Sequence, residues 1–201
     1  MRVLTAIALV AIAGSASASP RLEHVTDTKD GIAVYAHMDK KKQEGVTLAR
    51  GVIRAPLDKV WTVLIDLDRY VTFMPYMQAS RVVKRTDKHV WQYCRTDTPV
   101  VSDRDYTLKF TVKKAAGSGE SRIDWVIDNA AGPPPVDGVV RVQLATGSWR
   151  LKPVNGGKHT QFKYRLNTSP GGSIPLWVAH LGNKRAIPDI IRAVRKKLGV
   201  N

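Results

Sequence analysis

The chain has 201 residues, which suits one domain with enough interior to bury a core and room for a cavity. Lysine and arginine outnumber aspartate and glutamate by 32 to 17, and the net charge of +15 favours anionic partners, although a merely solvated basic surface is an equal alternative. Because the cations are scattered and no zinc-finger or helix-turn-helix signature accompanies them, we expect transient contact with an anionic membrane surface and no nucleic-acid partner.

The N-terminus has the three parts of a secretory signal peptide. Arg2 supplies the basic region, residues 3–13 form a short apolar run, and an Ala-x-Ala cleavage site ends at Ala18. The apolar run is too short to span a bilayer comfortably, so an uncleaved anchor is the weaker alternative. Cleavage removes one positive charge and leaves +14 (15 minus 1). We therefore predict a signal peptide at residues 1–18 and a single mature domain at residues 19–201, periplasmic or secreted.

The first half of the mature chain predicts two strands and then two short helices. The strands cover residues 32–37 and 46–54, and the second is rich in β-branched residues. Pro56 opens the first helix, whose apolar face is formed by Val60, Trp61, Leu64 and Ile65. The second helix covers residues 68–74 and is stopped by Pro75.

From residue 79 onward, apolar and polar residues alternate with the period of two that is typical of strands. The predicted strands cover residues 79–85, 90–95, 106–112, 122–127, 139–144 with a continuation at 148–152, and 162–166. In one of them, Tyr106, Leu108 and Phe110 share one face, whereas Thr107 and Lys109 share the other. A dry face and a wet face indicate an antiparallel sheet that is covered on one side only.

The last thirty residues predict the helix that covers this sheet. Ser173 is a suitable N-cap, and Pro175 lies in the first turn, where a missing N–H is tolerated. Pro188 falls inside the helix and is expected to kink it. One apolar stripe runs along the helix through Trp177, Leu181, Ile187, Ile191, Val194 and Leu198. We predict an α+β fold in which a curved antiparallel sheet wraps around this long C-terminal helix.

Several motifs in this order resemble a START domain, the lipid-transfer module related to the steroidogenic acute regulatory protein, within the SRPBCC helix-grip superfamily. They are Asp30-Gly31-Ile32-x-Val34-Tyr35, Arg54-Ala55-Pro56 with Val60-Trp61, residues 101–106 (Val-Ser-Asp-Arg-Asp-Tyr), residues 139–142 with Gly147-Ser148-Trp149, and residues 172–177 with Ala186-Ile187-Pro188. The resemblance is to the bacterial secreted type. It implies a hydrophobic tunnel that holds one lipid, often a sterol or phospholipid, between the sheet and the C-terminal helix. It also implies a movable gate at residues 130–138, which include Pro133, Pro134 and Pro135.

Strand parity and the helical stripe select the side chains that would touch such a ligand. For each of them the alternative is an ordinary place in a packed core. The candidates are Tyr93, Phe110, Trp125 and Val142 on the strands, and Trp177, Leu181, Ile187 and Ile191 on the helix.

Arg104 is a further candidate, because its alternation with Tyr106 directs it to the dry face. A buried arginine needs a polar partner. Arg104 would either anchor a lipid hydroxyl or phosphate, or form a structural pair with Asp103, Asp105 or Asp128; both readings stay open.

The sequence carries no signature of catalysis. The five histidines lack metal-ligand spacing, and no nucleophile elbow, phosphate loop or dinucleotide fingerprint occurs, so we predict no catalytic residue, metal or cofactor. Cys94, the one cysteine, is expected to be a small buried apolar residue. We predict a monomeric, non-enzymatic carrier of a sterol or phospholipid. The alternatives are a helix-grip cyclase or aromatase acting on a hydrophobic polycyclic substrate, and a basic interaction protein with a solid core.

Overall fold

The computed structural model describes residues 20–97, 102–169, 171 and 176–200, with side chains for all of these except 176–184. The predicted signal peptide lies outside the described residues. In chain order the elements are β1 (Glu23–Asp27), β2 (Ala33–Asp39), β3 (Glu44–Ile53), α1 (Leu57–Ile65), the 3-10 helix η1 (Leu67–Thr72), β4 (Met77–Arg85), β5 (His89–Thr96), β6 (Arg104–Lys113), β7 (Ser121–Ile127), the 3-10 helix η2 (Asn129–Ala131), β8 (Val140–Arg141), β9 (Leu144–Val154), β10 (His159–Ser169) and α2 (Leu176–Lys197).

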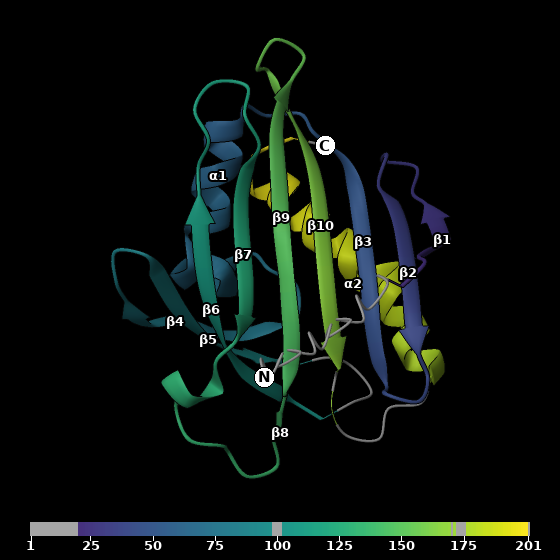
Figure 1. Ribbon diagram of the computed structural model, residues 1–201, viewed down its shortest axis with the longest axis vertical. Helices are drawn as coiled ribbons and strands as arrows, with labels where there is room; N and C mark the ends of the chain where they lie inside the picture. The colour runs from purple at the N-terminus through teal and green to yellow at the C-terminus, as the bar shows by residue number, and fades with distance from the viewer. Residues whose placement is uncertain (1–19, 98–101, 170, 172–175, 201) are drawn as a thin grey trace, which may run out of the picture.

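The strands form a single ten-stranded sheet with the order β1-β2-β3-β10-β9-β7-β6-β5-β4, and β8 pairs with β6. Neighbouring strands are antiparallel, except that β8 is parallel to β6. Figure 1 shows β7, β9, β10 and β3 side by side with α2 behind them, so the helix covers one face of the sheet. The predicted α+β fold, with a large curved antiparallel sheet and a C-terminal helix, is confirmed. No helix among the described residues is long and apolar enough to cross a bilayer.

Two parts of the sheet differ from the prediction. β1 was not predicted, because its sequence Glu-His-Val-Thr-Asp has a single apolar residue, but it pairs with β2 along the edge of the sheet. The strand predicted at residues 139–144 is divided between β8, which pairs with the start of β6, and the first residue of β9, which pairs with β10. Because of this division, the segment leaves β6 after Arg141 and joins β10 at Leu144.

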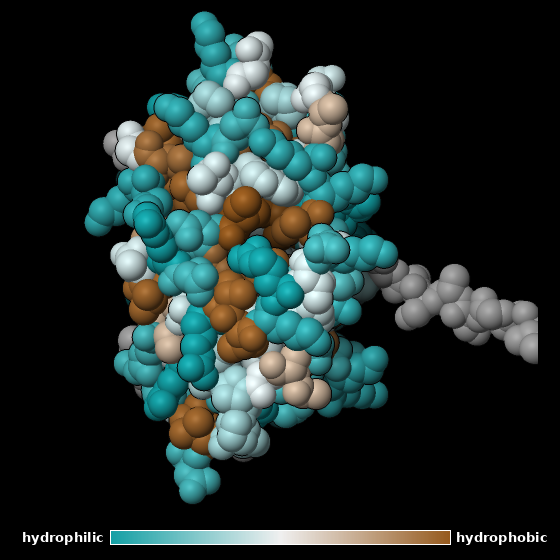
Figure 2. Space-filling model, turned by 90° about the vertical axis from the view of Figure 1, so that its left-hand side faces the viewer, coloured by the Kyte–Doolittle hydropathy of each residue, from teal (hydrophilic) through white to brown (hydrophobic). Residues whose placement is uncertain are grey.

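The α1 and η1 helices follow β3, and α1 is amphipathic. Pro56 is its N-cap, and Val60, Trp61 and Leu64 are buried on its inner face. Ile65, which was predicted on the same face, is 40% exposed. Val71 of η1 is 43% exposed. Figure 2 shows the side of the molecule that carries α1 and β4, where an apolar strip is bordered by hydrophilic residues. The core-facing part of α1 is therefore narrower than the predicted stripe.

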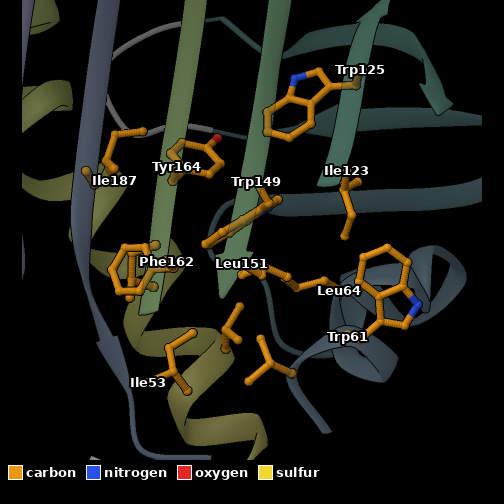
Figure 3. Close-up of a cluster of buried hydrophobic side chains, with 14 of the residues drawn as sticks. Ile53, Trp61, Leu64, Ile123, Trp125, Trp149, Leu151, Phe162, Tyr164 and Ile187 are labelled. Atoms are coloured by element: carbon orange, nitrogen blue, oxygen red, sulfur yellow. The ribbon is translucent and has the colours of Figure 1, made fainter. Parts of the chain in front are cut away.

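A row of aromatic rings crosses the concave face of the sheet, which is the face toward α2 (Figure 3). Ring centroids are 6.0 Å apart for Phe110 and Trp125, 5.6 Å for Trp125 and Tyr164, 4.7 Å for Tyr164 and Trp149, and 5.9 Å for Trp149 and Phe162. Edge and tilted contacts of this kind add to the free energy gained by burying the rings. Gly147 permits this packing, because a β-carbon there would come within 2.3 Å of the Trp125 ring. These ring contacts join strands β6, β7, β9 and β10 across the interior.

The C-terminal half of α2 is fastened to the sheet by Asp30, which lies in the turn between β1 and β2. Arg192 donates to both carboxylate oxygens of Asp30, at 3.1 and 2.9 Å. Arg195 is 5% exposed and donates to the Asp30 carboxylate at 3.1 Å and to the carbonyl of Val52 at 2.8 Å. This end of the helix is therefore held by charged hydrogen bonds as well as by Ile191 and Val194, which are fully buried.

Replacing Asp30 by asparagine should lower the free energy of unfolding by about 2 kcal/mol at pH 7, because buried Arg195 loses its counter-charge while Asp30 itself is 34% exposed. The Arg192 guanidinium holds the pKa of Asp30 well below its usual value. The stabilisation is thus complete above the unfolded pKa of about 3.9 and is lost as the pH falls through the folded pKa. Urea unfolding should show a constant difference between wild type and D30N above pH 5 or so, and a shrinking difference in stronger acid. A difference that grows on acidification would contradict this role of Asp30.

Candidate ligand chamber between the sheet and the C-terminal helix

The concave face is filled at the end nearest α1. Ile53, Leu64, Leu151, Phe162 and Val194 come from five different elements and have no exposed surface. Figure 3 shows several of these side chains, with Ile123 and Trp61, converging between the sheet and the helices. Such close packing from several directions leaves no space for a ligand at this end.

The opposite end of the same face is accessible. On β10, Leu166 lies two positions after the buried inward residue Tyr164, and on β7, Ile127 lies two positions after the buried inward residue Trp125. Leu166 and Ile127 are themselves only partly buried. The register confirms that they point inward, because Leu166 and Trp125 both lie opposite Gly147. These inward side chains keep part of their surface accessible, whereas those of the α1 end have none. The interior is thus divided into a filled half and an accessible half.

Tyr106 on β6 also points to this accessible half. Its side chain keeps accessible surface, yet burial raises the pKa of its hydroxyl well above the usual value. Directly opposite on β5 lies Cys94, a free thiol that is 1% exposed and whose pKa is likewise raised by burial. Both groups stay protonated at neutral pH, so they are hydrogen-bonding groups in an apolar setting and not bases. The prediction that Cys94 is a buried apolar residue is confirmed.

The structure places most of the predicted contact residues in the interior. Phe110 and Trp125 lie opposite each other on the concave face, and both are buried. Val142 is buried beside the start of β6, and Ile187 and Ile191 are buried on α2. The side chains of Trp177 and Leu181 lie outside the described residues.

Tyr93 was predicted to face the ligand, and this prediction is wrong. The register pairs Tyr93 with Thr107, whereas Val90 pairs with Phe110, so Tyr93 points to the convex face. There its hydroxyl donates to Asp105 at 3.2 Å. Burial and the neighbouring Asp105 charge raise the pKa of Tyr93. The parity could not be recognised from the sequence, because four successive residues of β5, from Trp91 to Cys94, are buried and so show no alternation.

Arg104 points to the concave face, as its alternation with Tyr106 predicted. It lies opposite Thr96 and Val140 at the start of β6, is 8% exposed, and donates to the carbonyl of Ser102. Burial lowers the pKa of its guanidinium. Arg104 therefore brings a cation to the accessible half of the interior.

Each of the three aspartates considered as partners for Arg104 binds another side chain. Arg95 donates to Asp103 at 2.6 and 3.0 Å, Arg141 binds Asp105, and the Trp91 indole donates to Asp128 at 2.7 Å.

The loop around Pro133 is held by a clamp that the sequence analysis missed. Arg141 binds Asp105 in a bidentate pair at 2.7 and 2.8 Å, and it also donates to the carbonyls of Pro133, at 3.2 Å, and Pro134, at 3.0 Å. The Asp105 carboxylate has no exposed surface. Its hydrogen bond with Arg141 raises the pKa of the Arg141 guanidinium. The backbone at Pro133 and Pro134 is thus held by the Arg141–Asp105 ion pair. Arg141 belongs to a motif quoted for the resemblance, but its partner is 36 residues away, so spacing along the chain gave no signal.

Among the described residues no three histidine, cysteine, aspartate or glutamate side chains come together as a metal site. The chemistry that the accessible half offers is apolar contact from Leu166, Ile127 and the aromatic row, the partly buried phenol of Tyr106, and the cation of Arg104.

Comparisons with known proteins agree with this architecture. The sequence profile of the family described as polyketide cyclase / dehydrase and lipid transport matches residues 53–195. A solved structure of a STAR-related lipid transfer protein from Xanthomonas axonopodis is 28% identical, covers 88% of this chain and 98% of its own, and superposes with a TM-score of 0.77. An uncharacterised protein of Pseudomonas aeruginosa is 28% identical over 90% of this chain and 87% of its own.

A third match, at the level of the fold, is the Zhui aromatase/cyclase of Streptomyces sp. R1128. It is 17% identical, covers 77% of this chain and 93% of its own, and has a TM-score of 0.59. The chain has a START-like helix-grip domain and belongs to the polyketide cyclase / dehydrase and lipid transport family.

Proposed function

We propose that the protein is a non-enzymatic carrier that binds one lipid, a sterol or phospholipid, between the concave face of the sheet and α2. The observation that carries this proposal is the division of the interior, in which Leu166, Ile127 and Tyr106 remain accessible beside a tightly packed aromatic row. Water-exposed apolar surface costs about 25 cal/mol per Å², so a carrier must enclose nearly all of a lipid. An inward-facing apolar wall closed at one end meets that requirement.

Lipid entry requires an element to swing away from the chamber. The gate in this proposal is the loop of Pro133, Pro134 and Pro135, in which Arg141 holds the carbonyls of Pro133 and Pro134. The second movable part is the helix preceding Pro188, because the C-terminal half of α2 is fastened by Asp30. We further propose that the carrier is a monomer, acts outside the cytoplasm after removal of residues 1–18, and touches anionic membranes transiently.

A cyclase or aromatase is the second candidate, because the family description covers polyketide cyclases. Such an enzyme would need groups in the chamber that accept and return protons. Burial raises the pKa of Tyr106 and Tyr164 above their ordinary value, so these phenols are poor bases at neutral pH. Their chemistry favours binding over proton transfer.

The proposal is tested by measuring the transfer of labelled lipids between donor and acceptor vesicles. A carrier should accelerate the transfer of a sterol or a phospholipid in proportion to its concentration. If no labelled lipid binds or moves, while a polycyclic polyketide is converted to product, the enzyme reading replaces the carrier.

In this proposal Arg104 anchors the polar end of the ligand. Replacing it by methionine should weaken the binding of a phosphate-bearing lipid about tenfold, which is the effect of losing one charged hydrogen bond, and should leave sterol binding nearly unchanged. The control is Arg95→Met, which removes a cation from the convex side of the neighbouring strand. Equal losses for both lipids, or unfolding without a selective loss, would assign Arg104 to structure.

A further inference from the structure

Five cations lie in one row across the convex face of the sheet, the face that points away from α2. The register places Lys113 opposite Arg122, Arg122 opposite Arg150, Arg150 opposite Lys163, and Lys163 opposite Arg50. Each belongs to a different strand, from β6 through β7, β9 and β10 to β3. Each is also one position away from an inward residue such as Ile123, Leu151 or Phe162, so all five side chains share the outer face. We call these five residues the basic row.

The basic row lies on the surface. Arg50, Lys113, Arg122 and Lys163 are exposed, and Arg150 at the centre keeps 23% of its side chain accessible. Figure 1 views this face directly, with β7, β9, β10 and β3 in front of α2. Adjacent strands are about 4.8 Å apart, so the row extends over roughly 19 Å. It is long enough to meet several phosphate groups at once.

Few counter-charges accompany the row. Arg150 pairs with Asp124 at 2.8 Å and approaches Glu120 at 3.9 Å, and Arg50 lies 4.9 Å from the ring centre of Tyr35. The ion pairs found among the described residues include none for Lys113, Arg122 or Lys163. Like charges that are directly opposite on neighbouring strands destabilise a sheet. An external anion bound along the row would relieve this repulsion.

We infer that the basic row is the surface by which the protein docks on a bilayer that contains anionic phospholipids. Its members are cations on adjacent strands with no aromatic ring in the row itself, whereas single-stranded nucleic acid is bound on grooves that interleave cations with stacking rings. The row is exposed over its length, so it suits a broad anionic surface. The choice of a bilayer as partner rests on the proposed carrier function, but the row itself does not.

The test uses vesicles of phosphatidylcholine with and without phosphatidylglycerol, and measures the fraction of the mature protein, residues 19–201, that sediments with them. The row variant is Lys113→Gln/Arg122→Gln/Lys163→Gln, which leaves the paired Arg150 intact. The matched control is Lys40→Gln/Lys41→Gln/Lys42→Gln, which removes three charges from an exposed loop between β2 and β3. Wild type should bind only the anionic vesicles. The row variant should bind them about 100-fold more weakly, and the control should lose less than tenfold.

Two further readouts separate docking from folding and from ligand binding. The row variant should melt at the same temperature as wild type or higher, because opposed like charges have been removed. The lipid that it carries after purification should be unchanged, because the three side chains face away from the interior. A protein that carries no lipid but still docks through the row would refute the carrier function alone. Equal losses in the row variant and the control, or wild-type binding to an acidic polymer but not to anionic vesicles, would overturn the inference.

Discussion

Replacing Asp105 by alanine should lower the free energy of unfolding by about 3 kcal/mol, the largest loss of stability that we expect from a single polar side chain. The Asp105 carboxylate is fully buried and accepts hydrogen bonds from Arg141 and Tyr93, so its removal leaves the Arg141 cation, 12% exposed, without compensation. Urea unfolding at neutral pH measures this loss.

The control is Asp103→Ala, two residues away. Its carboxylate is 24% exposed and pairs with Arg95, 34% exposed, so we expect a loss of about 1 kcal/mol. Because Arg141 also holds the carbonyls of Pro133 and Pro134, Asp105→Ala should release the gate and speed lipid exchange more than Asp103→Ala does. Equal effects of the two variants on stability and exchange would show that Asp105 is not the clamp of this loop.

Replacing Leu166 by tryptophan should reduce lipid binding at least tenfold and change the free energy of unfolding by less than about 1 kcal/mol. Leu166 lies on the accessible half of the concave face, opposite Gly147 and Thr47. The indole ring of a tryptophan there would occupy the proposed ligand site. Lipid titration and urea unfolding of the same protein measure the two effects.

The same substitution at Leu151 provides the control. Leu151 shares the concave face but is fully buried in the filled half, so a tryptophan there should cost about 3 kcal/mol through overpacking. If Leu166→Trp destabilises the protein as strongly as Leu151→Trp, both halves are equally packed and the chamber does not exist.

The faces of the central strands could be predicted because their sequences alternate. Phe110, Trp125 and Tyr164 each belong to a strand whose apolar residues occupy every second position. Together they form one aromatic row. Tyr93 was assigned to the wrong face because β5 is buried on both sides, where alternation disappears. The polar edge strand β1 gave no apolar pattern at all.

The clamp and the basic row depend on contacts between residues far apart in the chain. Arg141 reaches Asp105 because β8 pairs with β6 in parallel, an arrangement that local patterns do not encode. The five cations of the basic row occur at positions from 50 to 163 and meet only through the strand order β3-β10-β9-β7-β6. Composition alone indicated a basic protein, whereas the register showed where the charge is concentrated.

The central claim is that the accessible half of the interior holds one lipid molecule. Native mass spectrometry of the protein purified without added ligand, followed by organic extraction, tests it most directly. We expect one lipid for each chain and a loss of that mass in Leu166→Trp. A spectrum of the bare chain alone, together with no uptake of labelled sterols or phospholipids, would contradict the claim.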